Sequence, residues 1–152
     1  MIPVLDALFR AVFGDDGEAE AVKQTYLSVD DLKRLRDAGH EIGVHTHRHR
    51  VLPRLDFDAQ KREIQIGMEF LRETLGETRF TVAYPYGFHD DRTRRAMKEL
   101  GALAGVSMGR RMIKPDDIQA RWSLPRYDVN DCFDRASNEI RYELFSNLST
   151  GD

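Results

Sequence analysis

Residues 41–50 read EIGVHTHRHR, and this stretch sets the expectations for the fold. Ile42 and Val44 flank Gly43 in a short apolar run, which predicts a buried strand, and the chain turns strongly polar at His45. In α/β proteins, the loops that leave the ends of parallel strands carry the ligand-binding groups. Three of the five histidines of the chain lie in this segment, so it favours a metal site at the end of a strand.

The composition describes one globular domain. The chain has 152 residues, of which 41% are apolar and 32% charged, a balance that excludes a disordered chain and allows a single core. A net charge of -3 with mixed signs argues against a nucleic-acid partner. The single cysteine, Cys132, excludes an internal disulfide and a site built of several thiolates. Zinc would therefore need nitrogen and oxygen ligands.

Targeting signals are not evident in the sequence. No apolar run approaches the roughly 20 residues that cross a bilayer, so we expect no membrane span. The first residues also lack the long apolar segment of a secretory signal. From this chain alone the expected location is cytoplasmic, and an envelope location would require a signal that precedes it.

Helices alternate with short strands along the chain. The apolar spacing predicts strands near 42–44, 80–84 and 102–108, and an edge strand over 123–129. Helices are expected over 3–13, over 28–39, from Asp56 or Asp58 to Gly76, from Asp90 or Asp91 to Gly101, and over 133–144. Residues 15–18 are a connector or the first turn of a further helix to about Tyr26. This order indicates α/β units around a parallel sheet or barrel.

The chain is predicted to begin with a helical lead-in, residues 1–27, followed by the main domain, residues 28–152. At the start of that domain Ser28 and Asp31 come close to a capping box. The helix that follows carries Val29, Leu32 and Leu35 at helical spacing, so we expect these side chains to be buried.

His45 and His49 are the candidate metal ligands. Imidazole is a common zinc ligand, and two histidines four positions apart on a loop can turn toward one ion. A hydrolytic site needs about three protein ligands and an open position for water, and the expected third ligand, a carboxylate, is not evident. His40 is better explained as a structural residue. The alternative for the whole cluster is a solvated polar loop.

The sequence Tyr-Pro-Tyr-Gly at residues 84–87 is the second candidate. It follows the next predicted strand, so it would lie at the same end of the sheet as the histidines. Backbone N–H groups of such a turn can stabilise an oxyanion, although the same sequence also occurs simply as a turn.

The two segments together resemble the polysaccharide deacetylases, the carbohydrate esterases of NodB homology. His45-Thr46-x-x-His49 matches the His-Ser/Thr-x-x-His metal motif of that family, and residues 83–87, AYPYG, match a common form of its next motif. Residues 124–128, LPRYD, are similar to a segment after the following βα unit. The resemblance covers roughly residues 26–131.

The resemblance implies a fold, a reaction and roles for residues. The fold would be an α/β, partial distorted (β/α) barrel of the NodB-homology type, and the reaction a metal-dependent removal of acetyl groups from N-acetylated sugars of a polysaccharide or glycoconjugate. His45 and His49 would hold zinc or a similar divalent ion, and the backbone N–H of Tyr86 would help to hold the oxyanion. Arg126 would replace the arginine that orients the base in the family, and Thr46 would order the loop.

The chain departs from the family at both ends. The Thr-Phe-Asp-Asp-Gly motif, which supplies the base and the third ligand, is missing. The near copy at residues 13–17, FGDDG, ends a predicted helix, and Asp16 stands only 29 positions before His45. The late Leu-x-His motif is missing too, since no histidine follows His89. The chain is therefore expected to be the middle and later part of a deacetylase domain.

The alternative is a non-catalytic remnant that binds carbohydrate or a partner. A full barrel takes about 200 residues or more. An incomplete barrel exposes strand edges and apolar surface, which proteins normally cover. This predicts that the chain associates with a second copy.

Overall fold

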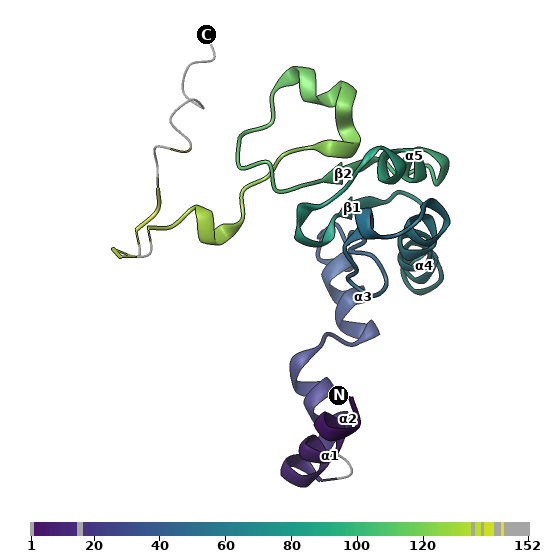
Figure 1. Cartoon of the computed structure of the whole chain (residues 1–152), viewed down its shortest axis with the longest axis vertical. Coiled ribbons are helices and arrows are strands. Elements are labelled where there is room, and N and C mark those ends of the chain that lie inside the picture. Colours follow the sequence, from purple (N-terminus) through teal and green to yellow (C-terminus); the bar gives the residue numbers. More distant parts are fainter. Residues whose placement is uncertain (1, 15–16, 135, 138, 142–143, 145–152) are drawn as a thin grey trace. The chain divides into compact units, whose positions relative to one another are not determined.

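The computed structural model describes residues 2–14, 17–134, 136–137, 139–141 and 144 (Figure 1). The chain divides into two compact units, Met1–Glu41 and Ile42–Asp152, which we describe separately. Among the described residues, no helix is long and apolar enough to cross a membrane. The predicted boundary between a lead-in of 1–27 and the main domain stays a prediction.

The described residues of the first unit form the helices α1 (Ile2–Phe13), α2 (Gly17–Thr25) and α3 (Val29–Asp37). The predicted capping box is present, because the Asp31 N–H donates to Ser28 Oγ over 3.1 Å and the Ser28 N–H donates to Asp31 Oδ2 over 2.8 Å. Of the two alternatives for residues 15–18, the further helix is confirmed, because α2 spans Gly17–Thr25.

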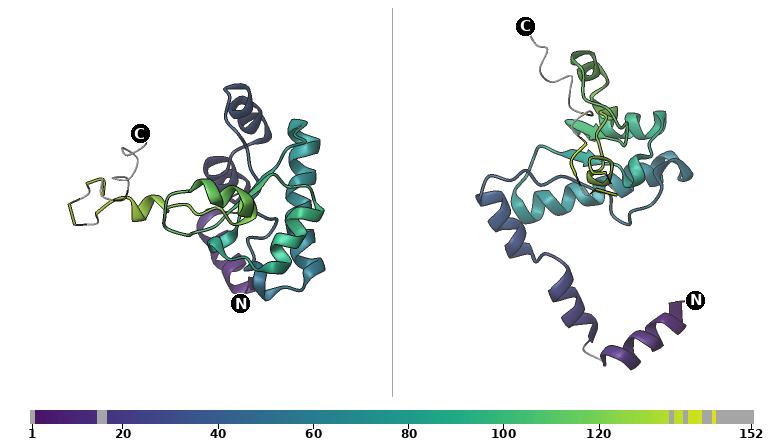
Figure 2. Two further views of the ribbon diagram at one scale, coloured as in Figure 1. Left: turned by 90° about the horizontal axis from the view of Figure 1, so that it is seen from above. Right: turned by 90° about the vertical axis from the view of Figure 1, so that its left-hand side faces the viewer.

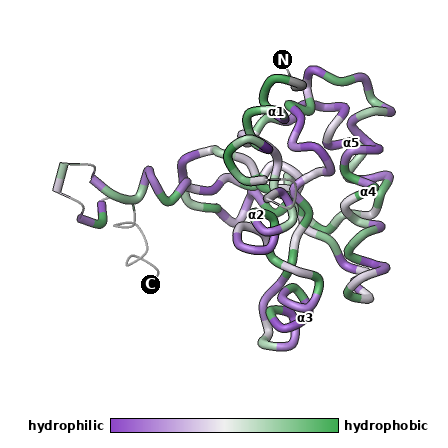
Figure 3. Tube along the Cα trace, turned by 90° about the horizontal axis from the view of Figure 1, so that it is seen from below, coloured by the Kyte–Doolittle hydropathy of each residue, from purple (hydrophilic) through white to green (hydrophobic). Residues whose placement is uncertain are grey.

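The prediction that α3 buries its apolar stripe is wrong. Val29 is exposed, and Leu32 and Leu35 are only half-buried. Apolar side chains of α1 and α2 are exposed as well, among them Leu5, Leu8 and Val22. The hydropathy colouring shows how rich α1 is in apolar residues (Figure 3).

The second unit is built on parallel strand segments. β1 (Thr81–Ala83) pairs in parallel with β2 (Ala104–Val106), and Val82 lies opposite Gly105 (Figure 1). Single parallel bridges extend this pairing from Val44 to Val82 on one side and from Val106 to Leu124 on the other. The strands predicted near 42–44 and over 123–129 are thus reduced to one bridging residue each. In the described part of the chain, four parallel segments follow one another with helices α4 (Phe57–Leu75) and α5 (Asp91–Glu99) between them, which confirms the α/β class.

Two helices cover this sheet. α4 (Phe57–Leu75) and α5 (Asp91–Glu99) pack against each other, as the further views show (Figure 2). Of the alternative caps, the structure selects Asp56, which accepts from the Ala59 N–H over 2.8 Å, and Asp90, which accepts from the Thr93 N–H over 3.0 Å. These local signals were present in the sequence, so both helix starts were predictable.

The buried face of α4 packs against Val44, the bridging residue that precedes His45. Its buried apolar side chains are Ile64, Met68, Leu71 and Leu75. Gly67 lies against Val44, which is only 3% exposed, and a Cβ added at Gly67 would be 2.6 Å from Val44 Cγ1. Contact this close requires glycine, so the helix fixes the position of the last residue before His45.

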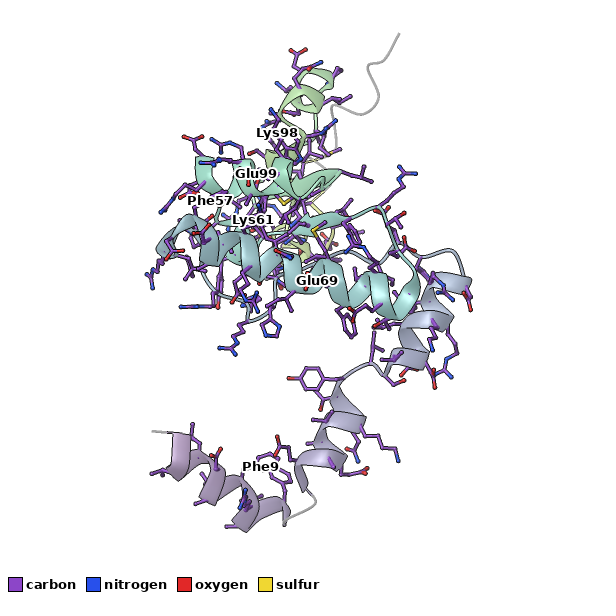
Figure 4. All side chains as sticks on the ribbon, turned by 90° about the vertical axis from the view of Figure 1, so that its right-hand side faces the viewer. Phe9, Phe57, Lys61, Glu69, Lys98 and Glu99 are labelled. Atoms are coloured by element: carbon purple, nitrogen blue, oxygen red, sulfur yellow. The ribbon has the colours of Figure 1, made fainter. Side chains whose placement is uncertain are left out.

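Polar contacts join α4 to α5 at the surface and beneath it. Lys61 and Glu99 form an ion pair of 2.8 Å, and their side chains point toward each other in Figure 4. Beneath this pair, the buried Thr93 hydroxyl donates to Gln60 Oε1 over 2.6 Å. The buried bond satisfies two polar groups inside the core, as burial requires.

The predicted closing helix over 133–144 is wrong. Phe133 and Ile140 instead form an antiparallel bridge, and the Asp134 N–H donates to the carbonyl oxygen of Glu139 over 2.8 Å. The cause is local, because the Asp134 carboxylate accepts from the backbone N–H groups of Ala136 and Ser137. Such side-chain bonds to nearby backbone favour a turn over a helix. Residues 135, 138, 142–143 and 145–152 of this region lie outside the described residues.

Substituting Gly67 by alanine tests the contact with Val44. The change adds helix propensity worth about 1 kcal/mol, but overpacking costs about 1–3 kcal/mol. We expect a net loss of unfolding free energy in urea, and a Gly67→Ala/Val44→Ala double variant that loses less than the sum of its single variants. Strict additivity would contradict the close contact.

Asp90 is predicted to make stability depend on acid pH. Burial alone would raise the pKa of Asp90, but hydrogen bonds from Thr93 and Arg92 outweigh it and lower the pKa from 3.8 to about 2. The unfolded chain therefore takes up a proton first, and about 1–2 kcal/mol of stability should be lost as the pH falls from about 4 to about 2. Asp90→Asn should lose this part of the pH dependence in acid unfolding curves. Parallel curves for the two proteins would contradict the assignment.

Candidate functional site

The two predicted motifs meet at one end of the sheet. His45 directly follows the bridging residue Val44, and Tyr84 directly follows β1, so the pairing of Val44 with Val82 brings the two loops together. The imidazole Nδ1 of His45 lies 2.6 Å from the carbonyl oxygen of Ala83. Since a carbonyl can only accept, Nδ1 carries the proton, and in the neutral imidazole Nε2 then keeps its lone pair. Metal-binding histidines in proteins are oriented by this kind of bond.

The histidine loop has an unusual backbone. Thr46 and His49 have positive φ angles of 64° and 53°, a conformation that residues other than glycine seldom adopt. The Arg48 N–H donates over 2.8 Å to Oε2 of Glu63, a buried residue of α4. The Thr46 hydroxyl oxygen is buried and has no hydrogen-bond partner among the described residues, so it does not order the loop through such a bond. The contact that holds the loop is instead the hydrogen bond from the Arg48 N–H to Glu63.

His45 and His49 face each other. Their ring centroids are 4.8 Å apart, the planes are inclined by 65°, and both side chains are exposed. At this separation two imidazoles can bind the same ion, so the donor set fits a divalent metal that prefers nitrogen ligands. Within the described part of the chain, no third histidine, cysteine or carboxylate completes a group of three. The two histidines are therefore an incomplete ligand set.

The near copy of the aspartate motif does not fill this gap in the described structure. Asp15 and Asp16 lie outside the described residues. The flanking residues are helical, because Phe13 ends α1 and Gly17 begins α2. The resemblance places the family motif on a strand, whereas the nearest described elements on either side are the helices α1 and α2.

Tyr86 lies beside the histidine pair. It sits in the 3-10 turn Pro85–Gly87 with a φ of 57°, and its ring centroid is 4.8 Å from that of His49. Gly87 has a φ of 73°, and a Cβ there would be 2.5 Å from Met108 Cγ, so only glycine fits this turn. The turn thus places a predicted oxyanion-binding residue next to a predicted metal ligand.

Arg126 is the remaining predicted site residue, and its role stays a prediction. Its side chain is exposed, and no hydrogen bond or ion pair in the described residues joins it to His45 or His49. Its carbonyl oxygen accepts from the Arg110 N–H over 3.1 Å. Hydrogen bonds from Asn130 hold the pKa of Asp128 below its usual range, and the positive charge of Arg126 adds to that effect.

His89 was not singled out from the sequence, yet it connects two parts of the site. Its Nδ1 lies 3.2 Å from the carbonyl oxygen of Gly87 and its Nε2 lies 2.7 Å from Ser123 Oγ. A carbonyl cannot donate, so Nδ1–H donates to Gly87, and in the neutral imidazole Nε2 then accepts from the hydroxyl of Ser123. Its ring also stacks on Tyr84 at 4.9 Å. His89 thus ties the Pro85–Gly87 turn to the segment that leads to Arg126.

Tyr84, on which the His89 ring stacks, is fixed by burial and by a hydrogen bond of its own. Its side chain is fully buried, and its hydroxyl donates to the carbonyl oxygen of Trp122 over 2.7 Å. Burial raises the pKa of Tyr84 well above its usual value, so this hydroxyl keeps its proton and remains a donor. A Cβ at Gly105 would be 2.0 Å from the hydroxyl oxygen of Tyr84, so β2 needs glycine at this position.

Among the residues that support the site, only Glu63 stands in a local sequence pattern that could have drawn attention to it. It falls with Gln60 on the otherwise apolar face of α4, where a buried polar residue requires a partner. His89 lies in a polar loop, and its partner Ser123 is 34 positions away, so no local pattern marks it.

The comparisons with known proteins agree with one another. Residues 14–105 match the family model of the polysaccharide deacetylases. The sequence is 36% identical over 64 residues, 42% of this chain, to chitin deacetylase 1 of Cryptococcus neoformans var. grubii, and the match covers 14% of that protein. The fold is similar to that of the Streptococcus pyogenes deacetylase PplD in complex with acetate, with a TM-score of 0.64 and 22% identity over 70% of this chain.

These matches bear on the fold and on the extent of the chain. The structural match covers 48% of the streptococcal chain, so this chain spans about half the length of that relative. The likeness confirms the predicted partial, distorted (β/α) barrel of the NodB-homology type.

A double-mutant cycle tests the link made by His89. Ser123→Ala should lose about 1 kcal/mol of unfolding free energy because it removes a hydrogen-bond donor. His89→Ala should lose more, since the stacking on Tyr84 is lost as well. We expect a coupling energy of about 0.5–3 kcal/mol between the two positions in urea unfolding. Additive losses would show that the two side chains do not interact.

Proposed function

The chain belongs to the polysaccharide deacetylase family, and from this membership we propose that it acts on N-acetylated sugars of a polysaccharide or glycoconjugate by metal-dependent deacetylation. The observation that carries the proposal is the pairing of His45 with His49 at the end of a parallel strand, directly beside Tyr86. All three residues lie within the segment that matches the family model. Similarity to a chitin deacetylase supports an N-acetylated sugar polymer as the substrate class.

The residues of the chain have distinct roles in this proposal. His45 would bind the ion through Nε2, because Nδ1–H is engaged with Ala83, and His49 would provide the second imidazole. A bound divalent ion such as Zn²⁺ supplies a Lewis acid and a water molecule that ionises near neutral pH. The backbone N–H of Tyr86 would stabilise negative charge on the amide oxygen. Glu63 holds the histidine loop through the Arg48 N–H.

The role proposed for Arg126 depends on a carboxylate. In this proposal Arg126 orients the base, and that base and the third metal ligand are supplied from outside the described residues. Its side chain is exposed, which leaves the guanidinium accessible to such a group.

A specific observation favours a second candidate function. In the described part of the chain, two histidines stand without a third ligand, whereas a hydrolytic zinc site takes about three. The alternative is a non-catalytic module of the same family that binds carbohydrate or a partner protein.

Histidine substitutions test the metal site. His45→Ala/His49→Ala should lose the zinc that the parent chain binds at one equivalent, as measured by calorimetric titration and metal analysis. His47→Ala is the matched control, because His47 lies in the same loop outside the ring pair and should bind zinc like the parent. Equal zinc binding by the parent and the double variant would contradict the assignment.

Acetate release from N-acetylglucosamine oligomers separates the two candidate functions. Zinc-dependent release that is lost in the double variant supports the hydrolase. Zinc binding without any release supports the non-catalytic module.

A further inference from the structure

Four rings form a row that begins at the candidate metal ligands. The centroids of His45 and His49 are 4.8 Å apart, those of His49 and Tyr86 are 4.8 Å apart, and those of Tyr86 and Phe88 are 6.4 Å apart. The metal assignment involves only the first two rings, and the oxyanion assignment involves the backbone of the third. Phe88, at the far end, has no role in either.

Phe88 is exposed although its backbone is held. Its side chain is 56% exposed and that of Tyr86 is 59% exposed. The Phe88 N–H donates to the carbonyl oxygen of Pro85 over 3.1 Å, and the next residue, His89, is bonded to Gly87 and Ser123. The ring is therefore displayed from an ordered turn. Two neighbouring rings that are exposed beside a candidate active site are accessible to a ligand bound there.

The chemistry of this surface fits the face of a sugar ring. A pyranose has a C–H face that is apolar and a rim of hydroxyl groups, and an aromatic side chain can cover the apolar face while the hydroxyl groups stay in water. The Tyr86 and Phe88 rings are inclined by 36° to each other, so they offer two tilted faces in succession. Phe88 itself offers no hydrogen-bonding group, which suits the apolar face and excludes recognition through charge.

We propose that Tyr86 and Phe88 form a stacking platform, with Phe88 as the binding subsite for the sugar next to the one whose acetyl group faces His45 and His49. This inference rests on the proposed function for the class of ligand. Because Phe88 lies at the end of the row away from the histidines, it contacts the neighbouring sugar of an oligomer and not an isolated monosaccharide. The platform thus makes the site selective for chains of sugars.

Titration with N-acetylglucosamine and with its β-1,4-linked tetramer tests the proposal. The parent chain should bind the tetramer more tightly than the monosaccharide. Phe88→Ala should weaken tetramer binding about tenfold, equivalent to about 1.4 kcal/mol, and should leave monosaccharide binding unchanged. Phe88→Trp, which keeps a stacking surface, should retain tetramer binding. Calorimetry or chemical-shift titration measures all of these affinities.

Phe70→Ala is the matched control, since Phe70 is an aromatic residue of α4 that is 46% exposed. It should bind both sugars like the parent. Equal tetramer binding by Phe88→Ala and the parent would overturn the subsite and leave the proposed function intact. Failure of the parent to bind either sugar would overturn the sugar specificity of the proposed function and the subsite with it. Thermal unfolding of each variant checks that the fold is retained.

Discussion

The hydrogen bond from His45 Nδ1 to the carbonyl oxygen of Ala83 joins the two motifs of this protein. It is possible because Val44 pairs in parallel with Val82, which places the end of one strand beside the end of the next. Parallel strands present their carboxyl ends at the same edge of a sheet, so residues 38 positions apart in the chain become neighbours. The bond also fixes which imidazole nitrogen can reach an ion. Every role assigned to the site depends on this geometry.

Helix α4 holds that geometry from behind the sheet. Gly67 allows the helix to approach Val44, and Glu63, one turn earlier, accepts the Arg48 N–H of the histidine loop. The first turn of α4 is joined to α5 through the buried hydrogen bond between Thr93 and Gln60. The positive φ angles of Thr46 and His49 cost conformational energy, and such strain persists only where the surrounding contacts enforce it. The strained loop and its buried anchor together indicate a built site.

Local chemistry decided what could be predicted from the sequence. Asp56 and Asp90 begin α4 and α5 through caps that act within three residues, so both helices were predictable, and the spacing of His45 and His49 was enough to pair them. The bonds of Glu63 and His89 bridge 15 and 34 positions, and no local pattern encodes such partners. The closing helix was predicted wrongly because apolar spacing ignores the Asp134 carboxylate, which bonds the backbone N–H groups of the next turn.

The proposed function requires that His45 and His49 bind one metal ion together. X-ray absorption spectroscopy of the zinc-loaded protein tests this shared binding, because imidazole rings give a characteristic scattering pattern that can be counted. We expect two imidazole nitrogens at about 2.0–2.1 Å with oxygen in the remaining positions. A zinc ion with no imidazole ligand, or one bound to sulfur at about 2.3 Å through Cys132, would contradict it.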